Sequence, residues 1–339
     1  MKIALFGNGA IAAEHVDAFR AIGDTGEEPV EIASVYAPRP GAAEAFARQH
    51  GIPRFATSID EILQDAQIEA VVICSPSALH APQARAALMA GKNVLCEIPL
   101  VLALDDAMAL REVAREQHRV LMVAHTLRFD PALREIRNRI ARDALDPHAI
   151  VARYHLLRRE NTGWTGRKRT WTDNLLWHHG GHAVDTVVWM LGSGEVTATG
   201  LAAPPSGESG ARLDAGIVVR TGSGVIGTIS LSYNSAIAVH DYTIIAGEST
   251  FQAAPGLLRD ARGVPIVTAG ADRRAIVIQN LAFANALRGN TDELVDVDAI
   301  LPSLRALQAI AGVGDWYPTG EERMLANGEM SLLDSRRGL

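Results

Sequence analysis

Short apolar runs alternate with stretches of helical periodicity over the first 124 residues. The runs at 2–6, 30–36, 70–75, 93–97 and 120–124 have the length and continuity of buried strands. Between them, apolar residues recur at helical spacing over 10–22, 41–50, 78–90 and 103–117. Strands that alternate with helices form a doubly wound parallel sheet. The pattern therefore predicts an α/β domain over residues 1–124.

The pattern changes in the rest of the chain. Residues 149–159 read as a strand, and after a loop one long helix is predicted over 173–191, ending at Gly192. Three further strands follow between 213 and 248, joined by glycine-containing turns, which is typical of an antiparallel meander. Helices are predicted over 273–289 and 298–313. We expect a second, α+β domain over 125–339, with an open, mostly antiparallel sheet and C-terminal helices that pack back on the first domain.

Composition narrows the class of protein. The 339 residues are enough for roughly two domains, and 48% are hydrophobic. A net charge of -7 argues against binding to nucleic acid or to an anionic membrane surface. No apolar run approaches the ~20 residues of a membrane helix, and the first run is too short for a signal peptide. Cys74 and Cys96 lie in apolar runs, so we expect a cytoplasmic protein with reduced thiols.

A glycine-rich turn follows the first predicted strand. It is Gly7-Asn8-Gly9-Ala10-Ile11-Ala12, the alanine-ended form of the G-x-G-x-x-G dinucleotide fingerprint. The first glycine permits a tight turn, and the second lets the backbone approach a pyrophosphate at the helix N-terminus. A turn without a ligand is the alternative. The place of the motif between a first strand and a first helix favours a Rossmann domain that binds NAD(P).

The end of the second strand distinguishes between the two dinucleotides. An acidic residue at this point holds the ribose 2′-hydroxyl of NAD. Here the sequence is Val35-Tyr36-Ala37-Pro38-Arg39-Pro40, with no acid and one arginine. Because an arginine can pair with a 2′-phosphate, Arg39 favours NADP. NAD stays possible, since the alternative for Arg39 is an exposed side chain in a proline-rich turn.

Three histidines and an aspartate are concentrated in "LLWHHGGHAVD", residues 175–185. On a helix His178, His182 and Asp185 share one face, whereas His179 is turned about 100° away. Histidines at i and i+4 are also the spacing of a zinc site, but the usual third ligand is absent from this stretch. A buried, hydrogen-bonded pair is a second alternative. Gly180-Gly181, which costs a helix roughly 1 kcal/mol per glycine, indicates close approach of another group and favours acid–base chemistry.

The chain resembles one family over nearly its whole length. Beside the fingerprint, "VVICSPSALH" (71–80), "GKNVLCEIPL" (91–100), "HTLRFDP" (125–131) and "GGHAVD" (180–185) occur in the order found in the glucose–fructose oxidoreductase / inositol dehydrogenase / MocA family. The resemblance implies a homodimer or homotetramer and His182 as the catalytic base, with His178 sharing the proton. Asp185 would hold the imidazole or form a plain salt bridge. Further cofactor-binding residues implied are Ser75, Pro76, His80, Glu97 and Ile98.

Two departures from the family pattern single out one branch. Glu97-Ile98-Pro99 stands where most members have Glu-Lys-Pro, and His178 stands where an aspartate is frequent. With the arginine-rich stretch 158–179, these features resemble a branch that oxidises a carboxylated cyclic hemiacetal to a lactone, with NADP, in aromatic catabolism.

Between 153 and 169, six basic residues face a single acid, and arginine suits a small anionic substrate because it grips carboxylates through paired hydrogen bonds. The predicted substrate-binding residues are Arg128, Arg158, Arg159, Arg169, Trp171 and His179. A sugar or inositol dehydrogenase is the alternative within the family. The loss of the lysine leaves a non-catalytic NADP-binding regulator as an alternative of another class.

Overall fold

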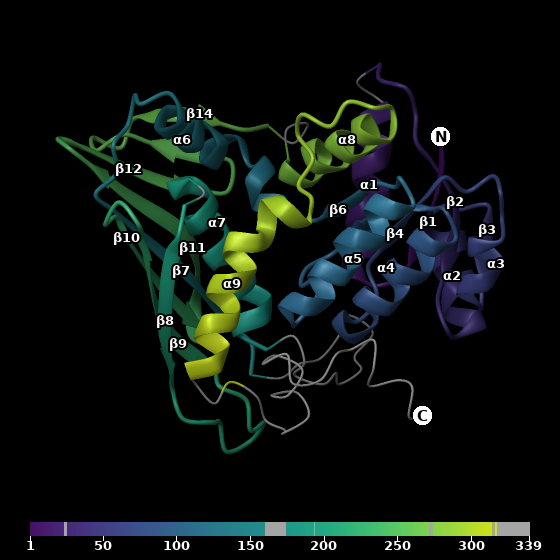
Figure 1. Ribbon diagram of the computed structural model, residues 1–339, viewed down its shortest axis with the longest axis horizontal. Helices are drawn as coiled ribbons and strands as arrows, with labels where there is room; N and C mark the ends of the chain where they lie inside the picture. The colour runs from purple at the N-terminus through teal and green to yellow at the C-terminus, as the bar shows by residue number, and fades with distance from the viewer. Residues whose placement is uncertain (24–25, 160–173, 193, 271–273, 314–315, 317–339) are drawn as a thin grey trace.

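The computed structural model describes residues 1–23, 26–159, 174–192, 194–270, 274–313 and 316. Two sheets organise these residues, and helices lie between the sheets (Figure 1). No helix among the described residues is both long and apolar enough to cross a membrane.

The first sheet has six parallel strands in the order β3-β2-β1-β4-β5-β6. The strands are β1 (Lys2–Phe6), β2 (Glu31–Tyr36), β3 (Arg54–Ala56), β4 (Ala70–Ile73), β5 (Asn93–Cys96) and β6 (Leu121–Val123). The five predicted strands are confirmed, and only the three-residue β3 is additional. This strand order is that of a Rossmann fold, whose ligands bind where the order reverses, between β1 and β4.

Helices connect these strands; the four that the periodicity predicted are present, and the short α3 and η1 are additional. They are α1 (Ala10–Gly23), α2 (Pro40–Gln49), α3 (Ile59–Leu63), η1 (Ser77–Leu79), α4 (His80–Met89) and α5 (Leu104–Glu116). A short turn, η2 (Thr126–Phe129), and helix α6 (Pro131–Ala141) lead into the second half of the chain. The carboxylate of Asp130 begins α6 by accepting the amides of Ala132 and Leu133, which satisfies two unpaired donors of the first turn.

The second sheet has eight strands in the order β14-β13-β12-β11-β7-β10-β9-β8. They are β7 (Ala149–Leu157), β8 (Val196–Ala202), β9 (Asp214–Thr221), β10 (Ile226–Ser232), β11 (Asn234–Ala246), β12 (Ser249–Ala254), β13 (Leu257–Arg259) and β14 (Pro265–Thr268). All pairs are antiparallel except the parallel pair of β7 and β10. The expectation of a mostly antiparallel sheet is therefore confirmed.

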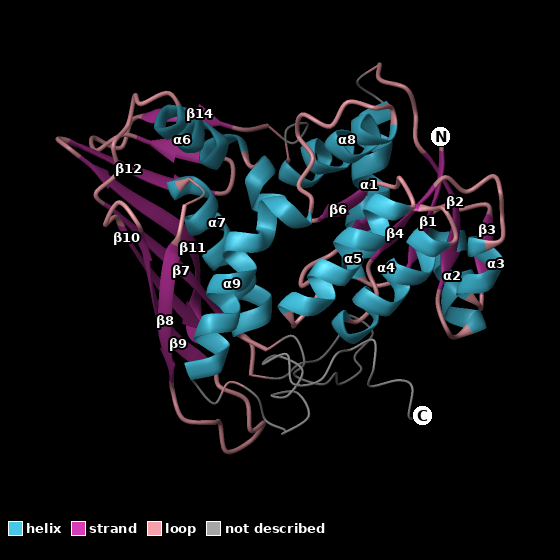
Figure 2. Ribbon diagram, in the orientation of Figure 1, coloured by secondary structure: helices cyan, strands magenta, loops and turns pink. Residues whose placement is uncertain are grey.

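Helices cover the face of this sheet that is turned toward the first domain, as Figure 2 shows. They are α6, the short π-helical turn η3 (Leu176–Gly180), its continuation α7 (Gly181–Leu191), and α9 (Val297–Val313). Helix α8 (Ala275–Leu287) packs on α1 instead. The C-terminal helices thus contact both halves of the chain, and α7 lies in the interior between them.

Candidate active site

The turn between β1 and α1 has the geometry of a dinucleotide-binding loop. Gly7 has a φ of 118°, and its amide donates to the Tyr36 carbonyl at 2.9 Å. A Cβ at Gly7 would lie 2.6 Å from the carbonyl oxygen of Cys74, so no other residue fits beside the end of β4. The amides of Ala10 and Ile11 begin α1 directly after this turn, where a pyrophosphate is held in this fold. The residues present therefore fit the phosphates of NAD(P).

Arg39 occupies the position immediately before α2. Its side chain is exposed and has no hydrogen-bond or ion-pair partner among the described residues. Asn8, in the fingerprint turn, donates from its side chain to the Ala42 carbonyl at 3.3 Å and so ties that turn to α2. The guanidinium of Arg39 thus stays available at the end of β2.

The loop after β4 is anchored by His80. Nδ1 of His80 lies 2.8 Å from the carbonyl oxygen of Pro99, and Nε2 lies 2.7 Å from that of Ser75. With both ring nitrogens used by the backbone, His80 has no polar atom left for a cofactor. His80 thus joins the Ser75-Pro76 loop to Glu97-Ile98-Pro99, and its contact with the cofactor stays a prediction.

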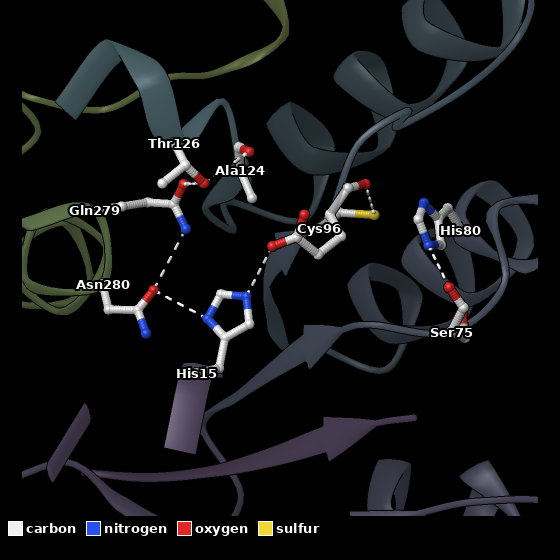
Figure 3. A network of polar contacts seen from close by, with 9 residues as sticks. His15, Ser75, His80, Cys96, Ala124, Thr126, Gln279 and Asn280 are labelled. Carbon is white, nitrogen blue, oxygen red and sulfur yellow. Dashed lines mark hydrogen bonds and ion pairs between the residues drawn. The ribbon is translucent and has the colours of Figure 1, made fainter. Parts of the chain in front are cut away.

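Glu97 is likewise held by the protein itself. Its Oε1 lies 2.9 Å from Nε2 of the fully buried His15, and Nδ1 of His15 lies 3.1 Å from Oδ1 of Asn280 (Figure 3). Gln279 extends the network by accepting the Thr126 hydroxyl at 2.8 Å. This chain of contacts ties α1 to β5, η2 and α8. The structure thus shows a structural contact for Oε1 of Glu97, and its contact with the cofactor stays a prediction.

Ile98 faces the helix that carries the histidines. A Cβ at Gly181, the first residue of α7, would lie 3.6 Å from Cδ1 of Ile98. A lysine at position 98 would place an ammonium group next to α7, and isoleucine places an apolar group there instead. The neighbouring Gly180 is tighter, since a Cβ would lie 3.1 Å from the Leu231 side chain. Protein atoms therefore account for the close approach at Gly180, whereas a Cβ at Gly181 would make only ordinary van der Waals contact.

The three histidines come together in one cluster. Because η3 is π-helical, the Gly180 amide bonds to the Leu175 carbonyl five residues earlier, and the ring positions differ from those of a regular helix. The rings of His178 and His179 stack with centroids 4.4 Å apart, and His182 lies 6.3 Å from His178. His179 is therefore part of the cluster, and the expectation that it turns away is wrong.

Polar contacts connect this cluster to β7 and β10. Nη1 of Arg158 lies 3.3 Å from both Nδ1 of His178 and the hydroxyl of Tyr233, and that hydroxyl lies 2.7 Å from Nδ1 of His179. Because a guanidinium can only donate, Nδ1 of His178 is an acceptor, and a neutral His178 carries its proton on Nε2. Arg158 thus fixes one histidine tautomer while placing a positive charge at the cluster.

Burial sets the charge of these imidazoles. It lowers the pKa of His179 and of His182 well below the ordinary value, and neighbouring basic groups, His178 first, lower both further. Burial also lowers the pKa of His240, on β11, to about 4. Nδ1 of His182 is buried without a hydrogen-bond partner among the described residues. The cluster therefore contains neutral imidazoles at pH 7, and a neutral imidazole is able to accept a proton.

Asp185 and Arg128 are partners of each other. Oδ1 and Oδ2 of Asp185 accept from Nη2 and Nε of Arg128 at 2.7 and 2.8 Å, and Oδ2 lies 3.1 Å from Nδ1 of His125. Nη2 of Arg128 also donates to the carbonyl of Ala299. Arg128 is thus a buried structural arginine rather than a substrate-binding one. For Asp185, the plain salt bridge is observed, and its hydrogen bonds go to residues other than His182.

Of the other predicted substrate-binding residues, the structure describes only Arg159. Arg159 is exposed and has no ion-pair partner among the described residues. Arg169 and Trp171 lie outside the described residues. Within the described ranges, no group of three or more His, Cys, Asp or Glu side chains is arranged to hold a metal ion.

The sequence analysis did not identify several members of the site. Tyr154 lies between His179 and His240, with ring centroids 4.6 and 3.9 Å away, and Tyr233 bonds to His179. Tyr154 and Tyr233 lie on β7 and at the end of β10, which pair in parallel. Only this long-range pairing places the two tyrosines at the histidines. No local signal in the sequence indicates it.

Comparison with known proteins now identifies the family. A model of the oxidoreductase family with an NAD-binding Rossmann fold matches residues 1–125, and one of the C-terminal region of bacterial oxidoreductases matches 131–271. The 4-carboxy-2-hydroxymuconate-6-semialdehyde dehydrogenase of Sphingobium sp. is 32% identical over 310 residues, which cover 91% of this chain and 96% of that enzyme. The chain belongs to the Gfo/Idh/MocA family of oxidoreductases. Members of this family are NAD(P)-dependent dehydrogenases that act on CH–OH groups.

Solved structures of Gfo/Idh/MocA type share the fold. An oxidoreductase from Agrobacterium radiobacter, in complex with NAD+, L-tartaric acid and magnesium, aligns with a TM-score of 0.78 at 16% identity and covers 92% of this chain and 95% of its own. A putative myo-inositol dehydrogenase from Sinorhizobium meliloti aligns with a TM-score of 0.75 at 22% identity, covering 92% and 96%. The fold of this chain, a Rossmann sheet followed by a large open sheet, is thus shared with these two solved structures.

Proposed function

We propose that the protein oxidises a cyclic hemiacetal bearing carboxylates to a lactone, with NADP as the hydride acceptor. The substrate would resemble 4-carboxy-2-hydroxymuconate-6-semialdehyde, and the product would resemble 2-pyrone-4,6-dicarboxylate. The 32% identity to the Sphingobium enzyme over nearly the whole chain supports this substrate class.

One observation carries the proposal. The guanidinium of Arg158 adjoins the histidine cluster at His178, while the position of the usual family lysine is taken by the apolar Ile98. A positive charge is thereby located at the cluster, on the β7 side, instead of beside α7 at residue 98. Such a site favours a carboxylated substrate over a neutral sugar, because arginine binds carboxylates through strong, charge-assisted hydrogen bonds.

His182 is the proposed general base. In the oxidation, the hemiacetal carbon loses a hydride, the hydroxyl loses a proton, and a carbonyl forms. The bound nicotinamide supplies the hydride acceptor. His182 takes the hydroxyl proton. Its lowered pKa keeps it neutral at pH 7, so that a ring nitrogen is open to the proton, while burial also makes this imidazole a weaker base than free histidine. Oxidation by this site needs no lysine, since the imidazole performs the proton transfer.

The test is NADP reduction by the purified protein with 4-carboxy-2-hydroxymuconate-6-semialdehyde, beside a panel of neutral aldoses and inositol. Turnover confined to the dicarboxylate is the expected result. Turnover of aldoses or inositol instead would make the protein an ordinary sugar dehydrogenase of the family. Tight NADPH binding with no turnover of any compound would contradict the proposed dehydrogenase activity and favour a non-catalytic, NADP-binding regulator.

We also propose that two copies associate through the uncovered face of the large sheet. Val151, Val218, Ile226 and Ile245 are exposed side chains on its central strands, and Figure 1 shows the covering helices on the opposite face. Replacing Val218 by lysine would place a charge in that contact. Light scattering of the eluted protein should then show a smaller assembly than for the unmodified chain. An unchanged mass would assign the contact to another surface.

A further inference from the structure

A cavity lies where η2, α6, α7 and α9 meet. Its volume is about 280 Å³, which is near the lower end of the roughly 300–1,000 Å³ typical of ligand pockets. Residues of η2, α6, α7 and α9 line it, among them Arg128, Arg137, Val188, Trp189, Ala299 and Pro302. None of these residues takes part in the proposed oxidation.

Two guanidiniums contribute to this cavity, and they differ in their partners. Arg128 is neutralised by Asp185. Arg137 is half-buried and has no hydrogen-bond or ion-pair partner among the described residues. Burial lowers the pKa of Arg137, and the positive charge of Arg128 lowers it further. The only acid in the lining, Asp298, is paired with Arg111 at 3.0 Å. Both carboxylates at the cavity, Asp185 and Asp298, are thus already paired, and Arg137 is the charged lining group without an opposite charge among the described residues.

The rest of the lining is apolar. Val188 and Trp189 come from α7, and Ala299 and Pro302 come from α9. A half-buried cation costs free energy when it has neither water nor an opposite charge around it. Arg137 also approaches the end of α7, since a Cβ at Gly192 would lie 3.8 Å from its Nη2. The partial negative charge of a helix C-terminus stabilises a cation there, but it leaves the apolar cavity beside the guanidinium unexplained.

We propose that this cavity is an accessory binding site for a small monocarboxylate with a flat apolar body. The carboxylate pairs with Arg137, and the apolar body lies against Trp189 and Pro302. The lining of this cavity shares no residue with the histidine cluster, where Arg158 is the arginine in contact with His178.

The experiment measures binding of 4-fluorobenzoate to the unmodified protein by fluorine NMR. 4-Fluorobenzamide, which has the same shape without the charge, is the matched ligand control, and inorganic phosphate is a competitor that has charge without a ring. Three variants locate the site. Arg137→Met removes the guanidinium and keeps an apolar stem, Arg134→Met removes an arginine one turn earlier on α6, and Arg158→Met removes the arginine of the histidine cluster.

The expected result is binding of the benzoate, little binding of the benzamide, and weak displacement by phosphate. Arg137→Met should raise the Kd about tenfold or more, as loss of a charged hydrogen bond does, whereas Arg134→Met and Arg158→Met should leave it unchanged. Loss of binding in Arg158→Met alone would assign the ligand to the active site and overturn the proposal. Equal binding of benzamide, or equally tight binding of phosphate, would overturn it too. Quenching of Trp189 fluorescence in the unmodified protein, absent from Trp189→Phe, tests the location without the arginine variants.

Discussion

Replacing Asp185 by asparagine tests the role that the structure assigns to its salt bridge. The side chains of Asp185 and Arg128 are 2% and 7% exposed, so the substitution leaves a buried guanidinium without its counter-ion. Breaking a buried pair in this way costs roughly 3–5 kcal/mol. At about 1.4 kcal/mol per power of ten, this lowers the ratio of folded to unfolded protein by between two and four powers of ten.

The matched control is Asp298→Asn, which removes the partner of Arg111 at the surface. The side chains of this pair are 36% and 51% exposed, and such pairs contribute about 0–1 kcal/mol. Urea unfolding, followed by circular dichroism, gives the free energy of unfolding for both variants. A loss below about 1 kcal/mol in Asp185→Asn, equal to that of the control, would refute the reasoning.

The stability difference between the unmodified protein and Asp185→Asn should also depend on pH, and the pKa of Asp185 gives the direction of that dependence. Burial opposes ionisation of Asp185, but Arg128 and His125 outweigh it, so the pKa of Asp185 lies well below its ordinary value. A group with a lowered pKa in the folded state stabilises the fold above its unfolded pKa, about 3.9 for aspartate, and loses that contribution as the pH falls. The stability gap between the unmodified protein and Asp185→Asn should therefore be constant from pH 7 to 5. It should shrink only below about pH 4.

Three further substitutions address the cofactor and the base. Gly7→Ala should abolish NADPH binding in fluorescence titrations, because its Cβ would lie 2.6 Å from the Cys74 carbonyl oxygen; Gly23→Ala, at the other end of α1 with nothing within 4 Å, should bind normally. Arg39→Ser should raise the KM for NADP roughly tenfold or more and leave that for NAD unchanged, and equal effects on both would reject NADP selectivity. His182→Gln should lower kcat by about 10²–10⁴-fold. In the unmodified enzyme, the acid limb of the pH profile of kcat/KM should have an apparent pKa below the ordinary histidine value of ~6.5, since the pKa of His182 is lowered. An apparent pKa above that value would exclude His182 as the base.

Local patterns in the sequence predicted the first domain well and the second in outline. Buried parallel strands are continuous apolar runs, so β1, β2, β4, β5 and β6 stood out, and Gly7 marked the turn by its spacing. The three-residue β3 and the five-residue α3 are too short to show a period. Helix α6 and strands β8 and β12 to β14 were also not predicted, although the large sheet as a class was.

The partners of individual side chains could not be predicted in the same way. Arg128 and Asp185 are 57 positions apart, and His15 and Glu97 are 82 apart. From the sequence, Arg128 could equally be a substrate-binding arginine. Only its ion pair with Asp185 in the folded chain shows that its charge is already neutralised. A charge count along the chain therefore overestimates the number of arginines available to a substrate.

The histidine cluster shows how one backbone irregularity changes a chemical interpretation. On a regular helix, His178 and His182 share a face and His179 points elsewhere, so the chemistry reduces to a pair. In the π-helical turn η3, the His179 ring stacks on His178 instead and reaches Tyr233, the residue that follows β10. Two of the three imidazoles are then held by the sheet side of the site, through Arg158 and Tyr233. His182, the second residue of the regular helix α7, is the imidazole left with an unpaired buried nitrogen among the described residues. This difference in partners, rather than the spacing of the histidines, distinguishes His182 from His178 and His179 and supports the proposal that His182 is the base.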